Sequence, residues 1–173
     1  DTSLSPALYV AVGAEDRNGK PIPAHVFAPA LTRTASAAAI DLWVFKQTLS
    51  WMVEHDDDVE QHALIVIPIS AASIKNEELP SLIMAEFMET PVPPGRICFA
   101  MPYQDVVENV AEVDDLINTL KEFGCHFVLD EFGSGHDNYD YIKGLDVDFV
   151  TVKTSFISDA SKNQKRFCDG EVD

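Results

Sequence analysis

Two adjacent carboxylates, Asp130 and Glu131, stand at the end of an apolar run in the stretch "HFVLDEFGSG" (126–135). Carboxylate oxygens are the ligands that hard divalent cations prefer. The "GSG" turn that follows, with Ser134 at its centre, has the composition of a loop that presents backbone N–H groups to a phosphate. The stretch therefore allows two interpretations: a metal and phosphate site, or a strand that ends in a glycine turn.

The chain around this stretch alternates apolar, β-branched runs with amphipathic segments. The apolar runs predict strands, and the amphipathic segments predict helices with Asp41 as one N-cap and Asp105 with Glu108 as a capping box. Repeated strand–helix units of this kind predict an α/β fold, with a parallel sheet and helices outside it. The expected strands are 63–70, 96–101, 125–132 and 147–156, and the expected helices are 41–55, 79–89, 105–124 and 137–145.

In parallel α/β folds, chemistry collects at the carboxyl ends of the strands. Those ends are expected at 68–70, 100–103, 130–131 and 151–153. Only the third end supplies carboxylates, whereas the others supply mainly proline, serine, alanine, tyrosine, threonine and lysine. A divalent cation needs several oxygen ligands that converge from different strands. The sequence therefore predicts no metal site, and no cofactor is expected.

Composition and charge exclude several classes of partner. The formal charge of −17 over 173 residues argues against nucleic acid and against an anionic membrane surface. No apolar run approaches the roughly 18 to 20 residues that span a bilayer. Cys98, Cys125 and Cys168 have no metal-binding spacing, and two of them lie in apolar stretches. Buried thiols in a reducing compartment are expected, which places the chain in the cytoplasm.

Three segments, in this order and spacing, carry a family resemblance. They are "PIPAHVFAPALTRTASAAAIDLWVF" (21–45), "LKEFGCHFVLDEFGSG" (120–135) and "YIKGLDVDFVTVKTSF" (141–156). They resemble the EAL domain, the phosphodiesterase fold that hydrolyses the bacterial second messenger cyclic di-GMP. The resemblance implies a TIM-barrel-like domain over residues 1–160, followed at 161–173 by a polar tail or the start of a further helix.

The resemblance also implies which positions the family uses for chemistry, and most of them carry other residue types here. The family's metal-binding glutamate falls on Tyr9, its phosphate-holding arginine on Gly13, its asparagine on Pro68 and its second glutamate on Ala100. Its aspartate pair falls on Asp130–Glu131, its lysine on Thr151 and its last aspartate on Lys153. Only the pair at 130–131 keeps its charge, and there Glu131 is longer than an aspartate by one methylene. Catalytic residues act as a unit, so a site that lacks several of them does not keep a proportionate part of the rate. Hydrolysis is therefore expected to be negligible.

Three functions therefore follow from the resemblance, in order of preference. The first is a non-catalytic signalling domain that acts as a regulatory or protein–protein interaction module. The second is a receptor that binds cyclic di-GMP without cutting it, with residual contacts from Asp130, Glu131 and Ser134. The third is an active phosphodiesterase.

Length points to an incomplete barrel. A complete barrel of this type takes roughly 250 residues, whereas the sequence has 173. Either the chain is a fragment, or the barrel is open and its edge strands need cover. A protein partner or self-association is the expected consequence.

Overall fold

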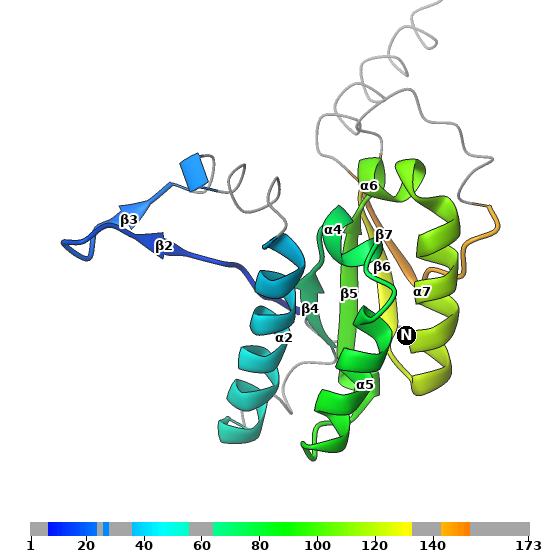
Figure 1. Cartoon of the computed structure of the whole chain (residues 1–173), viewed down its shortest axis with the longest axis horizontal. Coiled ribbons are helices and arrows are strands. Elements are labelled where there is room, and N and C mark those ends of the chain that lie inside the picture. Colours follow the sequence, from blue (N-terminus) through cyan, green and yellow to red (C-terminus); the bar gives the residue numbers. More distant parts are fainter. Residues whose placement is uncertain (1–6, 24–25, 28–35, 56–63, 133–142, 153–173) are drawn as a thin grey trace, which may run out of the picture.

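The chain forms a parallel sheet of five strands, in the order β1-β4-β5-β6-β7 (Figure 1). The computed structural model describes residues 7–23, 26–27, 36–55, 64–132 and 143–152. Each neighbouring pair of strands in this sheet runs parallel. The strands are β1 (Ala7–Tyr9), β4 (Leu64–Pro68), β5 (Ile97–Pro102), β6 (His126–Phe132) and β7 (Phe149–Val152).

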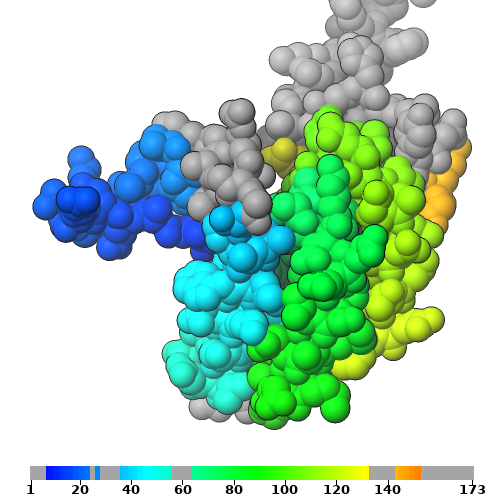
Figure 2. Space-filling view, viewed as in Figure 1, coloured from blue at the N-terminus to red at the C-terminus, as the bar shows by residue number. Residues whose placement is uncertain are grey.

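The helices pack against one face of this sheet (Figures 1 and 2). This arrangement confirms the predicted α/β class and matches an incomplete, TIM-barrel-like fold. Within the described part of the chain, no helix is both long and apolar enough to cross a membrane. The helices are α2 (Ala37–Glu54), α4 (Ala71–Ile74), α5 (Leu79–Met88), α6 (Tyr103–Glu108) and α7 (Val110–Phe123), with a 3-10 turn at Pro94–Arg96.

Side chains alternate between the two faces of the sheet, and a separate apolar cluster forms on each face. On the helix face, residues such as Ile65, Phe99 and Phe127 join the main core with the apolar sides of α2, α5 and α7. On the opposite face, a smaller apolar cluster forms around Val66 and Cys98. Because successive residues of a strand point to opposite faces, the register of the sheet decides which residues share a face.

All four predicted strands are present, but two helix boundaries differ from the prediction. Asp105 and Glu108 do not form a capping box, because α6 begins earlier, at Tyr103. The expected helix 105–124 is two helices, because Asn109 leaves the helical conformation and its side-chain Nδ2 donates to the Asp105 carbonyl. Asp41 is not an N-cap: α2 begins four residues earlier, at Ala37. Most of the expected helix 137–145 and the end of strand 147–156 lie outside the described residues.

The sequence reading missed a small antiparallel hairpin, β2 (Ala14–Glu15) and β3 (Pro21–Ile22), which projects away from the sheet (Figure 1). Its turn is held by Asp16, whose Oδ1 accepts from the backbone N–H groups of Asn18 and Lys20 at 2.8 and 3.0 Å. Two-residue strands carry too little apolar pattern to be read from sequence.

A polar clasp at the amino ends of β6 and β7 holds these two strands together. The carboxylate of Asp148 accepts from the Phe127 backbone N–H at 2.8 Å and lies 3.1 Å from the Lys121 ammonium. The His126 ring lies 3.5 Å from the same carboxylate. Burial alone would raise the pKa of Asp148, but the Phe127 N–H, Lys121 and His126 together lower it below its ordinary value. The ionised carboxylate therefore stabilises the fold.

Replacing Asp148 tests the clasp. We expect Asp148→Asn to lower the free energy of unfolding by about 2 kcal/mol near pH 7, because a hydrogen-bonded charge is lost. The folded-state pKa lies below the unfolded one, so this stabilisation is present above pH ~4 and disappears as the pH falls through the folded value. Urea denaturation of both proteins at neutral and acidic pH measures the difference.

Asp146→Asn is the matched control, because Asp146 pairs with the same lysine at 3.0 Å but is exposed. An exposed ion pair contributes about 0.5 kcal/mol or less. Equal losses in the two variants, or a loss for Asp148→Asn that does not change with pH, would contradict the clasp.

Candidate functional site

The register of the sheet brings five of the family positions to one face, the face opposite the helices. Ala100 belongs to the apolar cluster on that face. The other four positions point the same way. Each is paired across the sheet with a residue of that face, or lies two residues from one that is, and residues two apart on a strand share a face. The five positions are Tyr9 on β1, Pro68 on β4, Ala100 on β5, Asp130 on β6 and Thr151 on β7.

Two of the neighbouring positions are offset by two residues, whereas Pro68 and Ala100 pair directly. Tyr9 pairs with Val66, two residues before Pro68 on the same strand. Pro102, two residues past the family position of β5, pairs with Asp130. A stagger of this kind is expected where parallel strands tilt to close a barrel. The register therefore supports the assignment of these positions to one site.

Asp130 is the acidic residue among these five positions, and the described groups that bond to it are neutral. The Thr151 hydroxyl donates to the Asp130 carboxylate. The backbone N–H of Glu131 lies 3.0 Å from the same oxygen and 3.2 Å from the Thr151 hydroxyl. No described residue forms an ion pair with Asp130. Thr151 thus holds the carboxylate in place without neutralising it.

Tyr9 stands close enough to Asp130 for their charges to interact. Its side chain is half exposed, at 51%. Burial, followed by the negative charge of Asp130 and a smaller effect of Cys98, raises the pKa of the Tyr9 phenol. The phenol therefore stays protonated at neutral pH, when it donates hydrogen bonds and is a poor magnesium ligand.

Glu131 interrupts the regular end of β6. Its backbone φ is 57°, in the left-handed region, and the pairing of β6 with β7 shifts register between Leu129 and Phe132. Glu131 is exposed at this irregularity, whereas Asp130 stays partly buried. The two carboxylates predicted as a pair thus occupy different environments. Strained, bulged residues of this type are common beside functional sites.

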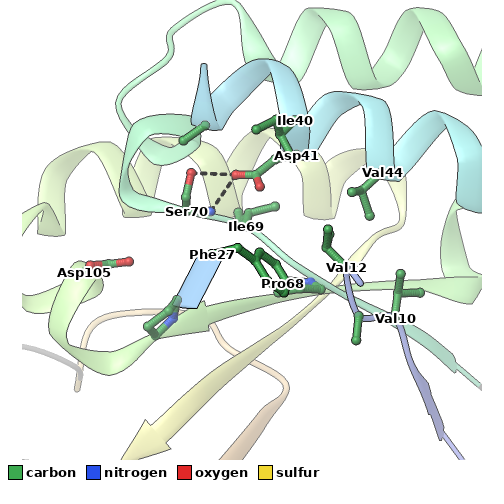
Figure 3. Close-up of a pocket in the computed structure, with 13 residues that line it drawn as sticks. Val10, Val12, Phe27, Ile40, Asp41, Val44, Pro68, Ile69, Ser70 and Asp105 are labelled. Atoms are coloured by element: carbon green, nitrogen blue, oxygen red, sulfur yellow. Dashed lines mark hydrogen bonds between the residues drawn. The ribbon is translucent and has the colours of Figure 1, made fainter. Parts of the chain in front are cut away.

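An apolar pocket of about 340 Å³ lies near the carboxyl ends of β4 and β5 (Figure 3). Its wall includes Val10, Phe27, Pro68 and other apolar side chains. Its charged lining residues in the described part of the chain are both acidic, Asp41 and Asp105. Burial, together with a smaller effect of the nearby Glu108, raises the pKa of the Asp105 carboxyl. The pocket therefore suits an apolar or cationic group better than an anion.

Asp41 has a structural role that the sequence reading missed. Its Oδ2 accepts from the Ser70 backbone N–H at 2.7 Å and the Ser70 hydroxyl at 2.6 Å (Figure 3). The Ser73 hydroxyl also donates to it, at 2.6 Å. These bonds tie the first turns of α2 to the segment that follows β4. From sequence alone, an aspartate at this place is also typical of an N-cap. The hydrogen bonds to Ser70 and Ser73 are therefore seen only in the tertiary structure.

The remaining predicted positions contribute less. Gly13 is exposed and lies after β1. Ser134 and Lys153 lie outside the described residues, so the expectation of a Ser134 contact stays a prediction. Cys98 and Cys125 are buried as predicted, and burial raises the pKa of each thiol to about 12. Neither thiol is reactive at neutral pH.

Nowhere in the described ranges do three or more His, Cys, Asp or Glu side chains gather into a group that could hold a metal ion. On the site face, the family position on β5 is a methyl group and the one on β4 is a proline ring. The arrangement offers one partly buried carboxylate, one hydroxyl and one phenol. These groups form hydrogen bonds but provide a single anionic ligand from the strands.

The left-handed conformation of Glu131 has a measurable cost. We expect Glu131→Asn to raise the free energy of unfolding by about 0.5–1 kcal/mol, because asparagine tolerates this region better than glutamate. Glu131→Gln is the control, since it removes the charge and keeps the unfavourable backbone. Chemical denaturation compares the two. A larger gain for glutamine than for asparagine would show that charge, and not backbone strain, dominates at this position.

Comparison with known proteins identifies the family. The EAL domain family matches residues 8–172 of the chain. The cyclic di-GMP phosphodiesterase PdeA of Borreliella burgdorferi is 26% identical over 167 residues, which is 95% of this chain and 24% of the relative. PdeB of Shewanella oneidensis, also a cyclic di-GMP phosphodiesterase, is 25% identical over 92% of this chain and 19% of its own length. The chain thus spans about a quarter or less of these relatives.

Solved structures agree on the fold. The EAL domain of FimX from Pseudomonas aeruginosa, bound to c-di-GMP, superposes with a TM-score of 0.81 at 20% identity, over 95% of this chain and 66% of that one. A second structure of a FimX EAL domain gives a TM-score of 0.77 at 22% identity, over 87% and 61%. The sheet, its helices, the stagger of the five positions and the family match lead to one conclusion. The chain belongs to the EAL domain family.

Proposed function

We propose that this EAL domain is non-catalytic and acts as a regulatory or protein–protein interaction module in bacterial signalling related to cyclic di-GMP. One observation carries the proposal. The five family positions share one face, yet they bear a phenol, a proline ring, a methyl group, one carboxylate and one hydroxyl. The backbone arrangement of the family site is present, but most of its positions carry side chains that neither bind a metal ion nor carry a charge.

Metal chemistry is the first capacity affected. Hydrolysis of a phosphodiester by a metal-activated water needs a cation held by several oxygen ligands, and a second metal needs more. Among the five aligned positions, Asp130 is the carboxylate, and Thr151 already bonds to it. The neighbouring Glu131 is exposed and lies in an irregular part of β6. This donor set supports the absence of turnover.

Nucleotide binding is the second capacity affected. A cyclic dinucleotide carries two phosphates, which need cations or several N–H donors. The charged groups lining the neighbouring pocket are Asp41 and Asp105, which repel an anion, and the chain as a whole carries a charge of −17. Gly13 and Thr151 stand where the resemblance implies the family's arginine and lysine. These features favour a domain that has lost the nucleotide.

A receptor that binds cyclic di-GMP without hydrolysis is the second candidate. It is favoured by the fold alone, since the FimX domain that superposes at a TM-score of 0.81 is bound to c-di-GMP. Active hydrolysis is the third candidate, and the curated names of PdeA and PdeB favour it. Both candidates require Asp130 to act on a ligand.

Calorimetric titration with cyclic di-GMP distinguishes the three functions. For the 1–173 chain we expect no binding heat with Mg²⁺, with Mn²⁺ or without metal, and no linear product on chromatography. A dissociation constant near 1 µM, about −8 kcal/mol, would establish the receptor instead. Turnover would overturn both non-catalytic candidates.

Asp130→Ala is the control for any heat that appears. Binding at the family site would vanish in this variant, because it removes the site's remaining strand carboxylate. Binding that survives the substitution takes place elsewhere and leaves the non-catalytic proposal in place. Glu86→Ala, on α5, is the matched variant, because it removes a carboxylate on the helix side of the sheet.

A further inference from the structure

We propose that the apolar pocket near the carboxyl ends of β4 and β5 binds a small organic cation, whose ammonium group pairs with Asp105 and whose apolar body lies against the aliphatic walls (Figure 3). The inference goes beyond the proposed function, because it assigns a ligand of a different charge to a different set of residues. Among the described residues that line the pocket, Pro68 is the only one of the five family positions.

The walls of the pocket come from segments that hydrogen bonds hold in place. One wall is the segment that follows β1, another is the beginning of α2, and the carboxyl ends of β4 and β5 form the third. The Val10 N–H donates to the Val66 carbonyl at 2.8 Å, which fixes the first wall to the sheet. Asp41 joins the α2 wall to the Ser70 N–H at 2.7 Å. The pocket is therefore preformed, as small-molecule sites usually are.

The size and composition of the pocket match a ligand with an apolar body. Its volume of about 340 Å³ lies at the lower end of the range of roughly 300–1,000 Å³ that is typical of small-molecule sites. Apart from the ring of Phe27, the hydroxyl of Ser70 and two carboxylates, the described side chains that line it are aliphatic. An alkyl chain or a small ring gains free energy when it leaves water for such walls.

Asp105 is a partly buried carboxylate whose charge is incompletely balanced. It forms no ion pair with any described residue. The Ala71 N–H and the charge of Lys75 favour its ionised form, but burial and the negative charge of Glu108 outweigh them and raise the pKa of the carboxyl. A positive charge beside Asp105 is therefore stabilised more than it would be beside a fully solvated carboxylate.

Asp41 adds a second negative charge to the lining. Its Oδ2 accepts from Ser70 and Ser73, and no described residue bonds to its Oδ1. Substitution of Asp41 would break the connection between α2 and the segment after β4. Asp105 is therefore the position at which the charge of the pocket can be tested.

The same features argue against other kinds of ligand. An anion would face two carboxylates in a chain of net charge −17. A metal ion needs several oxygen ligands, and no three candidate ligands gather within the described ranges. A neutral apolar molecule would cover the carboxylates and leave them without a partner. An ammonium group has three N–H donors and no acceptor, so it suits a site whose free acceptors are carboxylate oxygens.

NMR titration of the ¹⁵N-labelled 1–173 chain with hexylammonium tests the proposal. We expect a dissociation constant of about 1 mM or lower, which is within the ligand-efficiency limits for so few non-hydrogen atoms. The backbone amides that shift should be those of the pocket walls, at 10–12, 40–44 and 69–70. A salt concentration of about 150 mM screens the general attraction of this acidic chain for cations.

Three ligands of matched structure separate the contributions to binding. Methylammonium has the charge without the chain, hexanol has the chain without the charge, and hexanoate has the chain with the opposite charge. Each should bind at least about tenfold more weakly than hexylammonium, because each lacks one part of the match.

Two variants test the charge and the cavity separately. Asp105→Asn removes the charge and keeps an oxygen that can accept from the Ala71 N–H. It should weaken hexylammonium binding about tenfold and leave the affinity for hexanol unchanged. Val12→Phe, which fills part of the pocket, should weaken the binding of both ligands. Asp115→Asn is the matched control, because it removes the same charge from an exposed residue of α7 that does not line the pocket.

Far-UV circular dichroism and thermal denaturation accompany each variant, and the use of two variants keeps the test open if one fails to fold. The absence of hexylammonium binding at about 10 mM would overturn the proposal. Equal affinity for hexanol or hexanoate, or an equal loss in Asp105→Asn and Asp115→Asn, would overturn it as well. The amine and nucleotide titrations are independent, so either proposal can fail alone.

Discussion

The alternation of side chains along the paired strands determines both the composition of the core and the direction of the site positions. In β4, β5 and β6, every second residue enters the helix-covered core, where Ile65, Phe99 and Phe127 are fully buried. The intervening residues point to the other face whatever their chemistry. A shift of one residue in any register would exchange the two sets and expose the core. The packing of the core therefore determines where the site positions point, although their side chains are not part of the core.

This constraint explains how a site can lose its chemistry while its geometry survives. Exchanging a carboxylate for the Ala100 methyl group on the free face leaves the main core unchanged. The core and the Asp148 clasp stabilise the sheet from the helix side and from the amino ends of the strands. Conservation of fold is thus weak information about activity, and the argument for function must come from the site residues.

The sequence predicted the fold class and four strands well, because fully apolar runs such as "ALIVIP" have few alternatives to a buried strand. It could not predict the break at Asn109, because the apolar stripe of α6 and α7 continues through it. It also missed the tie from Asp41 to Ser70, which joins residues 29 positions apart. Such contacts depend on tertiary structure, which local propensity does not contain.

The candidate site was likewise predicted in part from the sequence. The resemblance assigned Asp130 and Thr151 to one site, and the register places them on one face, with the hydroxyl bonded to the carboxylate. The separate environments of Asp130 and Glu131 could not be read from two adjacent letters, because they follow from the left-handed backbone at residue 131. An adjacent pair of carboxylates predicts a shared ligand only when the strand stays regular.

We propose that the face around Asp130 holds no divalent cation. Electron paramagnetic resonance of Mn²⁺ titrated into the 1–173 chain tests this directly, because free and bound Mn²⁺ give distinct spectra. We expect the ion to remain free at protein concentrations of about 100 µM, which means that its binding free energy is weaker than about −5.5 kcal/mol. Binding of one equivalent at micromolar affinity that Asp130→Asn abolishes would contradict it.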